Sequence, residues 1–231
     1  MISENIASIK QRMVVACTRA GRNPSDVTLI AVSKTFPWEK VREVVEGGIT
    51  DVGENYVQEL LEKRPHLIDA HIRWHFIGHL QSNKARYIAD WIHLVHSLDS
   101  ITVANELHKQ AKKSGRIIEV LIEVNTTDER SKFGVQPEHT VAFVESLAGL
   151  DSLSITGLMT IGPFLPDPEG SRPMFRRLRL LRDQIAGLHQ PNVRMKHLSM
   201  GMTGDFEVAI EEGATLIRVG TAIFGSRTKP A

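Results

Sequence analysis

Residues 27–53 read VTLIAVSKTFPWEKVREVVEGGITDVG and contain one complete strand–helix–strand unit. The apolar, β-rich run Val27–Ser33 predicts a strand, and the helical pattern of Trp38–Glu46 follows it after a turn. A glycine pair ends that helix, and Asp51–Gly53 forms the next short strand. Because a crossover helix returns the chain to the same end of a sheet, the two strands must be parallel. This unit predicts an α/β protein.

The same unit recurs at a spacing of roughly 25 residues. The expected strands are Val27–Ser33, Asp51–Gly53, Trp74–Ile77, Ile92–Ser97, Ile117–Val124, Ile155–Met159, Met195–Ser199 and Thr215–Val219. The expected crossover helices are Trp38–Glu46, Val57–Lys63, Asn83–Asp90, Ile101–Lys113, Pro137–Ala148, Pro173–Leu188 and Gly204–Glu211. An amphipathic helix, apolar at helical spacing from Ile2 to Cys17, precedes them and ends near Gly21.

Eight such units in one continuous chain predict a closed (β/α)8 barrel, the TIM-barrel class of α/β fold, with an added N-terminal helix. No linker or low-complexity segment interrupts the pattern, so residues 1–231 are expected to form a single domain. An open, doubly wound sheet is the alternative. The glycine-rich dinucleotide fingerprint and the phosphate loop typical of such sheets are absent from the sequence.

Composition narrows the class of protein further. Of the 231 residues 42% are hydrophobic, and 28 Lys and Arg residues nearly balance 27 Asp and Glu residues. A disordered chain and a disulfide scaffold are excluded, and the near-zero net charge gives no overall attraction for nucleic acid or a membrane surface. No apolar run approaches the roughly 20 residues that span a bilayer. The single Cys17 is expected to be a buried, reduced thiol, so we predict a cytoplasmic protein.

In barrels of this class the functional side chains lie at the carboxyl ends of the strands. Lys34 follows the apolar run Leu29–Ser33 at the end of the first strand. A partly buried ammonium loses its proton more readily than an exposed one, and a neutral amine can form a Schiff base with an aldehyde. The alternative is a lysine whose aliphatic stem covers the barrel rim while its charge stays in water.

The last two strand ends carry small and hydroxyl-bearing residues. Loops after the seventh and eighth strands of such barrels often bind phosphate through backbone N–H groups and glycines. Ser199, Gly220 and Thr221 suit that role. Ordinary turn chemistry is the alternative, with Thr203 capping the next helix.

Arg218 stands in the otherwise apolar strand Leu216–Val219. An unpaired buried charge is prohibitively costly, so an inward guanidinium needs an acceptor. The acceptor is Glu54, another core carboxylate or a ligand atom, and the spacing alone does not choose among them.

Two other clusters favour structural explanations. His71, His75 and His79 recur every four residues, but in a strand followed by a loop this spacing does not bring three imidazoles to one point. We therefore predict no metal site, and we expect His75 to be a hydrogen-bonded residue of the rim. The arginines from Arg172 to Arg182 flank the apolar stripe of a helix and are expected on its solvated face.

Together, the motifs at the strand ends are similar to those of one known family. They are Ala31-Val32-Ser33-Lys34-Thr35, Gly53-Glu54-Asn55-Tyr56, WHFIGHLQSNK at 74–84, Ser131-Lys132-Phe133-Gly134, Gly157-Leu158-Met159, Ser199-Met200-Gly201-Met202 and RVGTAIFG at 218–225. Over nearly its whole length the chain resembles the pyridoxal 5′-phosphate homeostasis protein family. That family resembles the barrel domain of alanine racemase without the extra β domain, in agreement with the predicted fold.

The resemblance implies that pyridoxal 5′-phosphate (PLP) is the cofactor, bound as an internal aldimine on Lys34. Arg218 would face the pyridine nitrogen, and Asn55 would lie near the ring. The phosphate would be held by Ser199, Gly220 and Thr221. The sequence departs from the family pattern at Thr203-Gly204-Asp205 and at His79, which leaves all six of these residues in place.

The resemblance further implies a PLP carrier and regulator that affects amino-acid and 2-oxo-acid balance, with little or no catalysis. An arginine at the ring nitrogen keeps it unprotonated, which disfavours the quinonoid form on which most PLP enzymes rely. Racemisation needs a second base, and we expect Tyr56 to be a packing residue. We therefore predict no catalytic residue, a monomer, and PLP-dependent apoenzymes as partners. The alternatives are a PLP-dependent amino-acid racemase or lyase, and a Schiff-base aldolase acting on a phosphorylated sugar.

Overall fold

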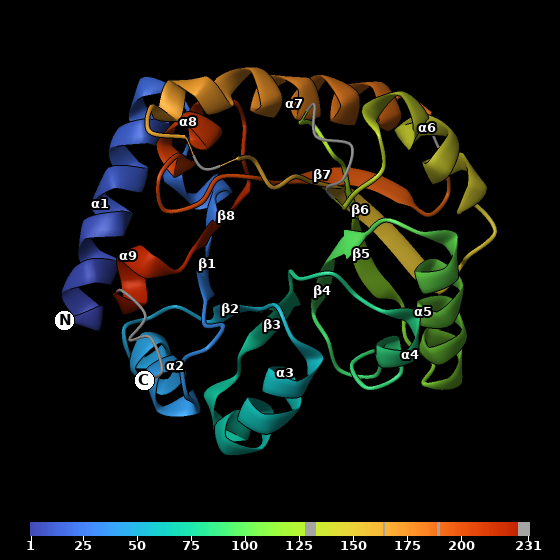
Figure 1. The fold of residues 1–231 in the computed structure, drawn as a ribbon, viewed down its shortest axis with the longest axis horizontal. Helices are drawn as coiled ribbons and strands as arrows, with labels where there is room; N and C mark the ends of the chain where they lie inside the picture. The colour runs from blue at the N-terminus through green and yellow to red at the C-terminus, as the bar shows by residue number, and fades with distance from the viewer. Residues whose placement is uncertain (128–132, 164, 189, 226–231) are drawn as a thin grey trace.

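In the computed structural model the chain forms a closed barrel of parallel strands surrounded by helices (Figure 1). The structure describes residues 1–127, 133–163, 165–188 and 190–225. The strands follow one another around the barrel in chain order, and the last pairs with the first. Closure confirms the predicted (β/α)8 barrel and excludes the open, doubly wound sheet. No helix in the four described ranges is long and apolar enough to cross a membrane.

The strands in the described ranges correspond one to one with those predicted, with small shifts at their ends. They are β1 (Thr28–Val32), β2 (Asp51–Glu54), β3 (Arg73–Phe76), β4 (Leu94–Leu98), β5 (Ile118–Glu123), β6 (Leu153–Met159), β7 (Val193–Ser199) and β8 (Leu216–Val219). Most are buried on both faces, which explains their continuous apolar runs.

The helices are α1 (Ile2–Arg19), α2 (Trp38–Glu46), α3 (Val57–Lys63), α4 (Ser82–Ala85), α5 (Ile101–Lys113), α6 (Pro137–Ser146), α7 (Arg172–Ala186), α8 (Phe206–Glu211) and α9 (Thr221–Phe224). Short 3-10 helices in the described ranges are η1 (Pro24–Asp26), η2 (Arg64–Ala70) and η3 (Pro168–Ser171). Helix α4 is shorter than predicted. Helix α8 begins after Asp205, so Thr203 does not cap it. The sequence pattern missed α9 because a single turn is too short to show a helical period.

Two apolar clusters stabilise the barrel. The larger one fills the space between the strands and the helices, and α1 contributes one whole face to it, including the buried Cys17. The smaller one comprises Ile30, Leu94, Leu121, Met159 and Leu216. Since successive strand residues point to opposite faces, Ala31 packs outward against the helices and Ile30 points into the barrel. Buried polar side chains share that interior: His75, His96, Ser199 and Arg218.

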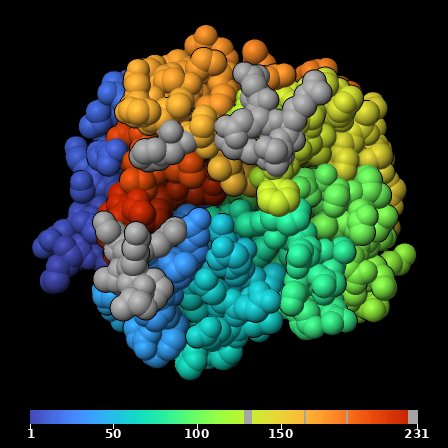
Figure 2. Space-filling model, viewed as in Figure 1, coloured from blue at the N-terminus to red at the C-terminus, as the bar shows by residue number. Residues whose placement is uncertain are grey.

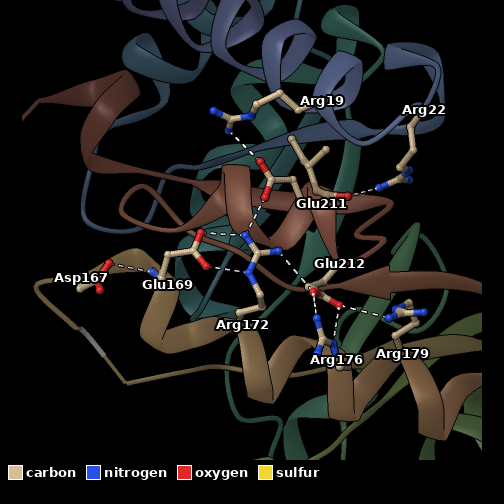
Figure 3. A network of polar contacts seen from close by, with 10 residues as sticks. Arg19, Arg22, Asp167, Glu169, Arg172, Arg176, Arg179, Glu211 and Glu212 are labelled. Carbon is tan, nitrogen blue, oxygen red and sulfur yellow. Dashed lines mark hydrogen bonds and ion pairs between the residues drawn. The ribbon is translucent and has the colours of Figure 1, made fainter.

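On the outside of the barrel an ion-pair network joins α7 to α8 and α1 (Figure 3). Glu212, which directly follows α8, is buried and accepts hydrogen bonds from three side chains of α7: Arg172, Arg176 and Arg179. Glu211 bridges Arg172 and Arg19. The arginine run is therefore only partly a solvated face, because these side chains also fasten α7 to its neighbours.

Replacing Glu212 by glutamine should lower the free energy of unfolding by about 2 kcal/mol, since three charge-assisted hydrogen bonds lose their acceptor charge. Burial alone would raise the pKa of Glu212, but hydrogen bonds from Arg176, Arg172 and Arg179 lower it below 4.5. The stabilisation is thus present above pH 4.5 and is lost as the pH falls further. Urea denaturation at pH 7 measures the effect. Glu138→Gln is the control, because Glu138 meets Arg177 at 3.9 Å on the exposed surface and should contribute little.

Candidate functional site

A cavity of about 340 Å³ opens at the carboxyl ends of β1 and β8. Five of the six predicted site residues line it: Lys34, Asn55, Arg218, Gly220 and Thr221. In the space-filling view the blue β1–α2 segment lies beside the red β8–α9 segment on one face (Figure 2). The rings of Phe36 and Phe224 stack across these segments with centroids 4.9 Å apart. Residues from opposite ends of the chain therefore build one site.

The backbone on both sides of Lys34 is anchored. The Lys34 side chain is half-buried, and the next residue, Thr35, has a φ of 68°. This left-handed conformation is costly for a β-branched residue, and the Thr35 N–H donates to Glu59 Oε2 at 2.8 Å. On the other side, the Ser33 hydroxyl donates to Glu54 Oε1 at 2.5 Å. These bonds fix the direction in which Lys34 leaves β1.

Lys63, buried at the end of α3, joins these anchors into one network. Its Nζ donates to Glu54 Oε1 at 2.5 Å, to Glu59 Oε2 at 2.7 Å and to the Ser33 carbonyl at 2.9 Å. Burial raises the pKa of Glu54, although the charge of Lys63 and its hydrogen bond act in the opposite direction. Lys63 thus supplies the positive charge that this buried carboxyl faces, directly behind Lys34.

Arg218 is buried and still lines the cavity. Its Nη1 donates to Ser199 Oγ at 2.5 Å, and its Nη2 donates to the Thr160 carbonyl at 2.8 Å. These acceptors are a hydroxyl and a backbone carbonyl, and not Glu54 or another carboxylate, as the sequence analysis had considered. Burial lowers the pKa of Arg218 to about 10 against the attraction of Glu123, so the guanidinium remains charged at neutral pH.

Glu123, at the end of β5, is a buried carboxyl whose pKa is influenced by this guanidinium. Burial, with a smaller contribution from Asp99, raises the pKa of Glu123 to about 7, although Arg218 lowers it. The Glu123 carboxyl is therefore divided between its neutral and ionised forms at neutral pH. Burial also raises the pKa of Asp99, while the nearby His79 opposes this.

Ser199 is not brought to the cavity wall with the other five residues. Its side chain is fully buried inside the barrel, where its Oγ also lies 2.8 Å from His96 Nδ1. The loop that follows reaches the cavity through residues 202–205, which include the departure from the family pattern. Gly201 permits this path, because its φ is 90° and a Cβ there would lie 2.5 Å from a side chain of α8.

Gly220 and Thr221 form the adjacent wall. A Cβ on Gly220 would lie 3.3 Å from the Val32 carbonyl, so a side chain would crowd β1. Thr221 Oγ1 donates to Thr203 Oγ1 at 3.2 Å and so joins the loops that follow β7 and β8. Small residues and hydroxyls thus meet where the sequence predicts a phosphate.

Asn55 adds an amide oxygen without a hydrogen-bond partner among the described residues. Its side-chain Oδ1 is buried, and no hydrogen bond within the described part of the chain reaches it. Buried polar atoms are usually paired, so a ligand is the natural partner. The remaining wall is largely apolar: Val32, Ile77, Ile161, Pro163, Leu165 and Met202. Apolar walls with a few oriented polar groups are typical of small-molecule sites.

The prediction that His75 lies at the rim is wrong. His75 is buried inside the barrel, between Asp51 and His96, because it is an inward-facing residue of a strand that is covered on both sides. Among the residues that the structure describes, no group of His, Cys, Asp or Glu is arranged to hold a metal ion. Ser131 and Lys132 of the family motif lie outside the described residues.

Known proteins match this chain along nearly its whole length. The family "Alanine racemase, N-terminal domain" matches residues 5–228. A pyridoxal phosphate homeostasis protein from Aquifex aeolicus is 46% identical over 224 residues, which are 97% of each chain. The chain belongs to the pyridoxal phosphate homeostasis protein family. Another member, from Pseudomonas aeruginosa, is 44% identical and aligns over 98% of this chain and 96% of its own.

A solved relative extends the likeness to three dimensions. PipY of Synechococcus elongatus, solved with PLP bound, is 35% identical, and the two superimpose with a TM-score of 0.84 over 97% of this chain and 100% of PipY. Family membership and this superposition confirm both the resemblance and the alanine-racemase-like barrel.

Sequence reasoning missed two buried residues that support the site, Lys63 and His96. Lys63 ends a helix and has the pattern of a surface residue. The signal for His96 was its place in an apolar strand that is buried on both faces, where a polar side chain must find a partner.

Proposed function

We propose that this protein binds PLP in the cavity between β1 and β8, with Lys34 as the residue that holds the aldehyde covalently. It acts in cytoplasmic PLP homeostasis, as a carrier and regulator that affects amino-acid and 2-oxo-acid balance, with little or no catalysis. Residues 1–231 serve as one cofactor-binding domain, and the monomer exchanges PLP with PLP-dependent apoenzymes. The observation that carries the proposal is the convergence of Lys34 and Arg218, from two neighbouring strands, on one cavity.

The residues present fit this cofactor. PLP supplies a reactive aldehyde, which condenses reversibly with a primary amine, and an electron-withdrawing ring. Lys34 supplies the amine, and the unpartnered Asn55 oxygen offers a hydrogen-bond acceptor beside it. Gly220 and Thr221 line the same cavity and would hold the phosphate. The PLP-bound structure of PipY, a relative that is 35% identical, supports PLP as the cofactor.

The polar groups of the site favour retention of the cofactor over chemistry on a substrate. With a pKa of about 10, Arg218 stays protonated at neutral pH, so toward the ring nitrogen of PLP it could only donate a hydrogen bond and could not accept a proton. Ser199 accepts a hydrogen bond from this guanidinium and so helps to orient it. Tyr56 is 55% exposed and is not among the residues that line the cavity, so it is poorly placed to serve as a base.

Titration of the purified protein with PLP should produce visible absorbance that saturates at one cofactor per chain. Borohydride reduction followed by peptide mass mapping should find the pyridoxyl group on Lys34. Lys34→Ala should gain no such absorbance, because the amine is lost, whereas the control Lys109→Ala alters an exposed lysine and should behave as wild type. A pyridoxyl group on another lysine, together with unchanged binding by Lys34→Ala, would contradict the proposal.

Two further measurements separate the proposal from the alternatives. Exchange of the α-proton of L-amino acids in deuterated water at about one turnover per second or faster would indicate a racemase or lyase. A colourless protein that ignores PLP but is trapped by borohydride with a phosphorylated sugar would indicate an aldolase.

A further inference from the structure

A chain of buried hydrogen bonds crosses the barrel interior from the amino end of β2 to the cavity. It starts at Asp51 Oδ1, which lies 3.0 Å from His75 Nε2, and His75 Nδ1 lies 2.9 Å from His96 Nε2. His96 Nδ1 lies 2.8 Å from Ser199 Oγ, which accepts from Arg218 Nη1 at 2.5 Å. The five residues come from β2, β3, β4, β7 and β8, and all five are buried.

The two ends of this chain determine its direction. An arginine has only donors, so Arg218 must donate to the Ser199 oxygen. An ionised carboxylate has only acceptors, so His75 Nε2 must carry a proton and donate it to Asp51. Burial alone would raise the pKa of Asp51, but hydrogen bonds from His75 and Arg73 outweigh it and keep the carboxyl ionised.

The middle of the chain then has one solution. A neutral imidazole has one N–H and one bare nitrogen, so His75 Nδ1 is bare and accepts from His96 Nε2–H. His96 Nδ1 is bare in turn and accepts the Ser199 hydroxyl proton. Burial lowers the pKa of both histidines, which keeps both rings neutral. Every proton in the chain therefore points away from the cavity.

We propose that Asp51, His75 and His96 are positioning residues. They make the Ser199 hydroxyl donate its proton to His96, so that a lone pair of the Ser199 oxygen faces Arg218. This arrangement, with the Thr160 carbonyl as second acceptor, holds the guanidinium in one orientation at the cavity. The role toward PLP rests on the proposed function, whereas the tautomers of the two histidines do not depend on it.

The first test uses the full-length protein without PLP. Two-bond ¹H–¹⁵N correlation spectra at pH 7 should show His75 and His96 as neutral rings with the proton on Nε2, with assignments from His75→Gln and His96→Gln. A proton on Nδ1 of either ring, or a charged ring, would overturn the proposal. Because no cofactor is needed, this result is independent of whether the protein binds PLP.

The second test removes the end of the chain that sets its direction. In Asp51→Asn the side chain can also donate, so the His75 tautomer should become mixed, PLP should bind about tenfold more weakly, and its absorption maximum should shift as in Ser199→Ala. Asp69→Asn is the matched control, because Asp69 also accepts two hydrogen bonds from one arginine, Arg42, but on the surface. Wild-type tautomers and wild-type PLP affinity in Asp51→Asn would refute the positioning role. If Asp51→Asn does not fold, His96→Gln is tested instead. It should also bind PLP about tenfold more weakly, and wild-type PLP affinity in this variant would refute the positioning role.

Discussion

Lys63→Met should lower the free energy of unfolding by about 3–5 kcal/mol, because it removes one partner of a buried ion pair. Methionine is close in length to the lysine stem, so packing changes little and the charge is what is removed. Glu54 is fully buried and would lose the ammonium group that lies against it, while the Ser33 carbonyl and Glu59 would each lose a donor. Breaking one partner of a buried pair costs much more than the pair itself contributes.

The pH dependence identifies the cause of this loss. Burial already raises the pKa of Glu54, and the loss of Lys63 should raise it further. A carboxyl whose pKa is raised in the folded state can take up a proton at acidic pH, so the destabilisation should be greatest at neutral pH and should shrink as the pH falls toward 4.5. Urea denaturation of Lys63→Met and the wild type at pH 5 and pH 7 measures the loss of unfolding free energy at each pH.

Lys40→Met is the matched control. Lys40 pairs with Glu43 at 2.6 Å, but both side chains are 45% exposed, so the loss should stay within about 0.5 kcal/mol. Since Lys63 also holds the turn that carries Lys34, PLP capture by Lys63→Met should be slower than in the control. Equal stability of the two variants would show that the buried network contributes little.

The free energy of unfolding of Glu123→Gln, relative to that of the wild type, should increase by on the order of 3 kcal/mol between pH 4.5 and pH 8. Burial raises the pKa of Glu123 from 4.5 to about 7. Between these values the folded protein holds a proton that the unfolded chain has released. This contribution of Glu123 to stability is therefore fully present below pH 4.5 and is lost as the pH rises through about 7. Glutamine, which does not titrate, has no such loss.

The measurement is a series of urea denaturation curves of both proteins from pH 4.5 to pH 8. Glu119→Gln is the control, because it removes one carboxyl from the same strand at a position that is only partly buried. If the difference in unfolding free energy between Glu123→Gln and the wild type stays constant, Glu123 is ionised over the whole pH range. The charge of Arg218 would then lower the pKa of Glu123 more strongly than burial raises it.

Much of the fold could be predicted from the sequence because the evidence for it is local. The alternation of short apolar runs with helical stretches reports strand and helix directly, and crossover helices force parallel pairing. Lys34 could be placed at a strand end for the same reason, and the short motifs at the successive strand ends were sufficient to indicate the family and its cofactor. Each of these features depends on residues within a few positions of one another.

Tertiary structure alone decided which side chains meet inside the barrel. Ser199 and His96 are 103 positions apart, and Arg218 and Thr160 are 58 apart, so no spacing in the sequence predicts that they touch. The period of a strand tells which residues point inward, but closure of the barrel and the register of the strands determine which inward residues share a level. For that reason the hydrogen bond between Ser199 and Arg218 was not predicted, and His75 was expected at the rim and lies in the interior.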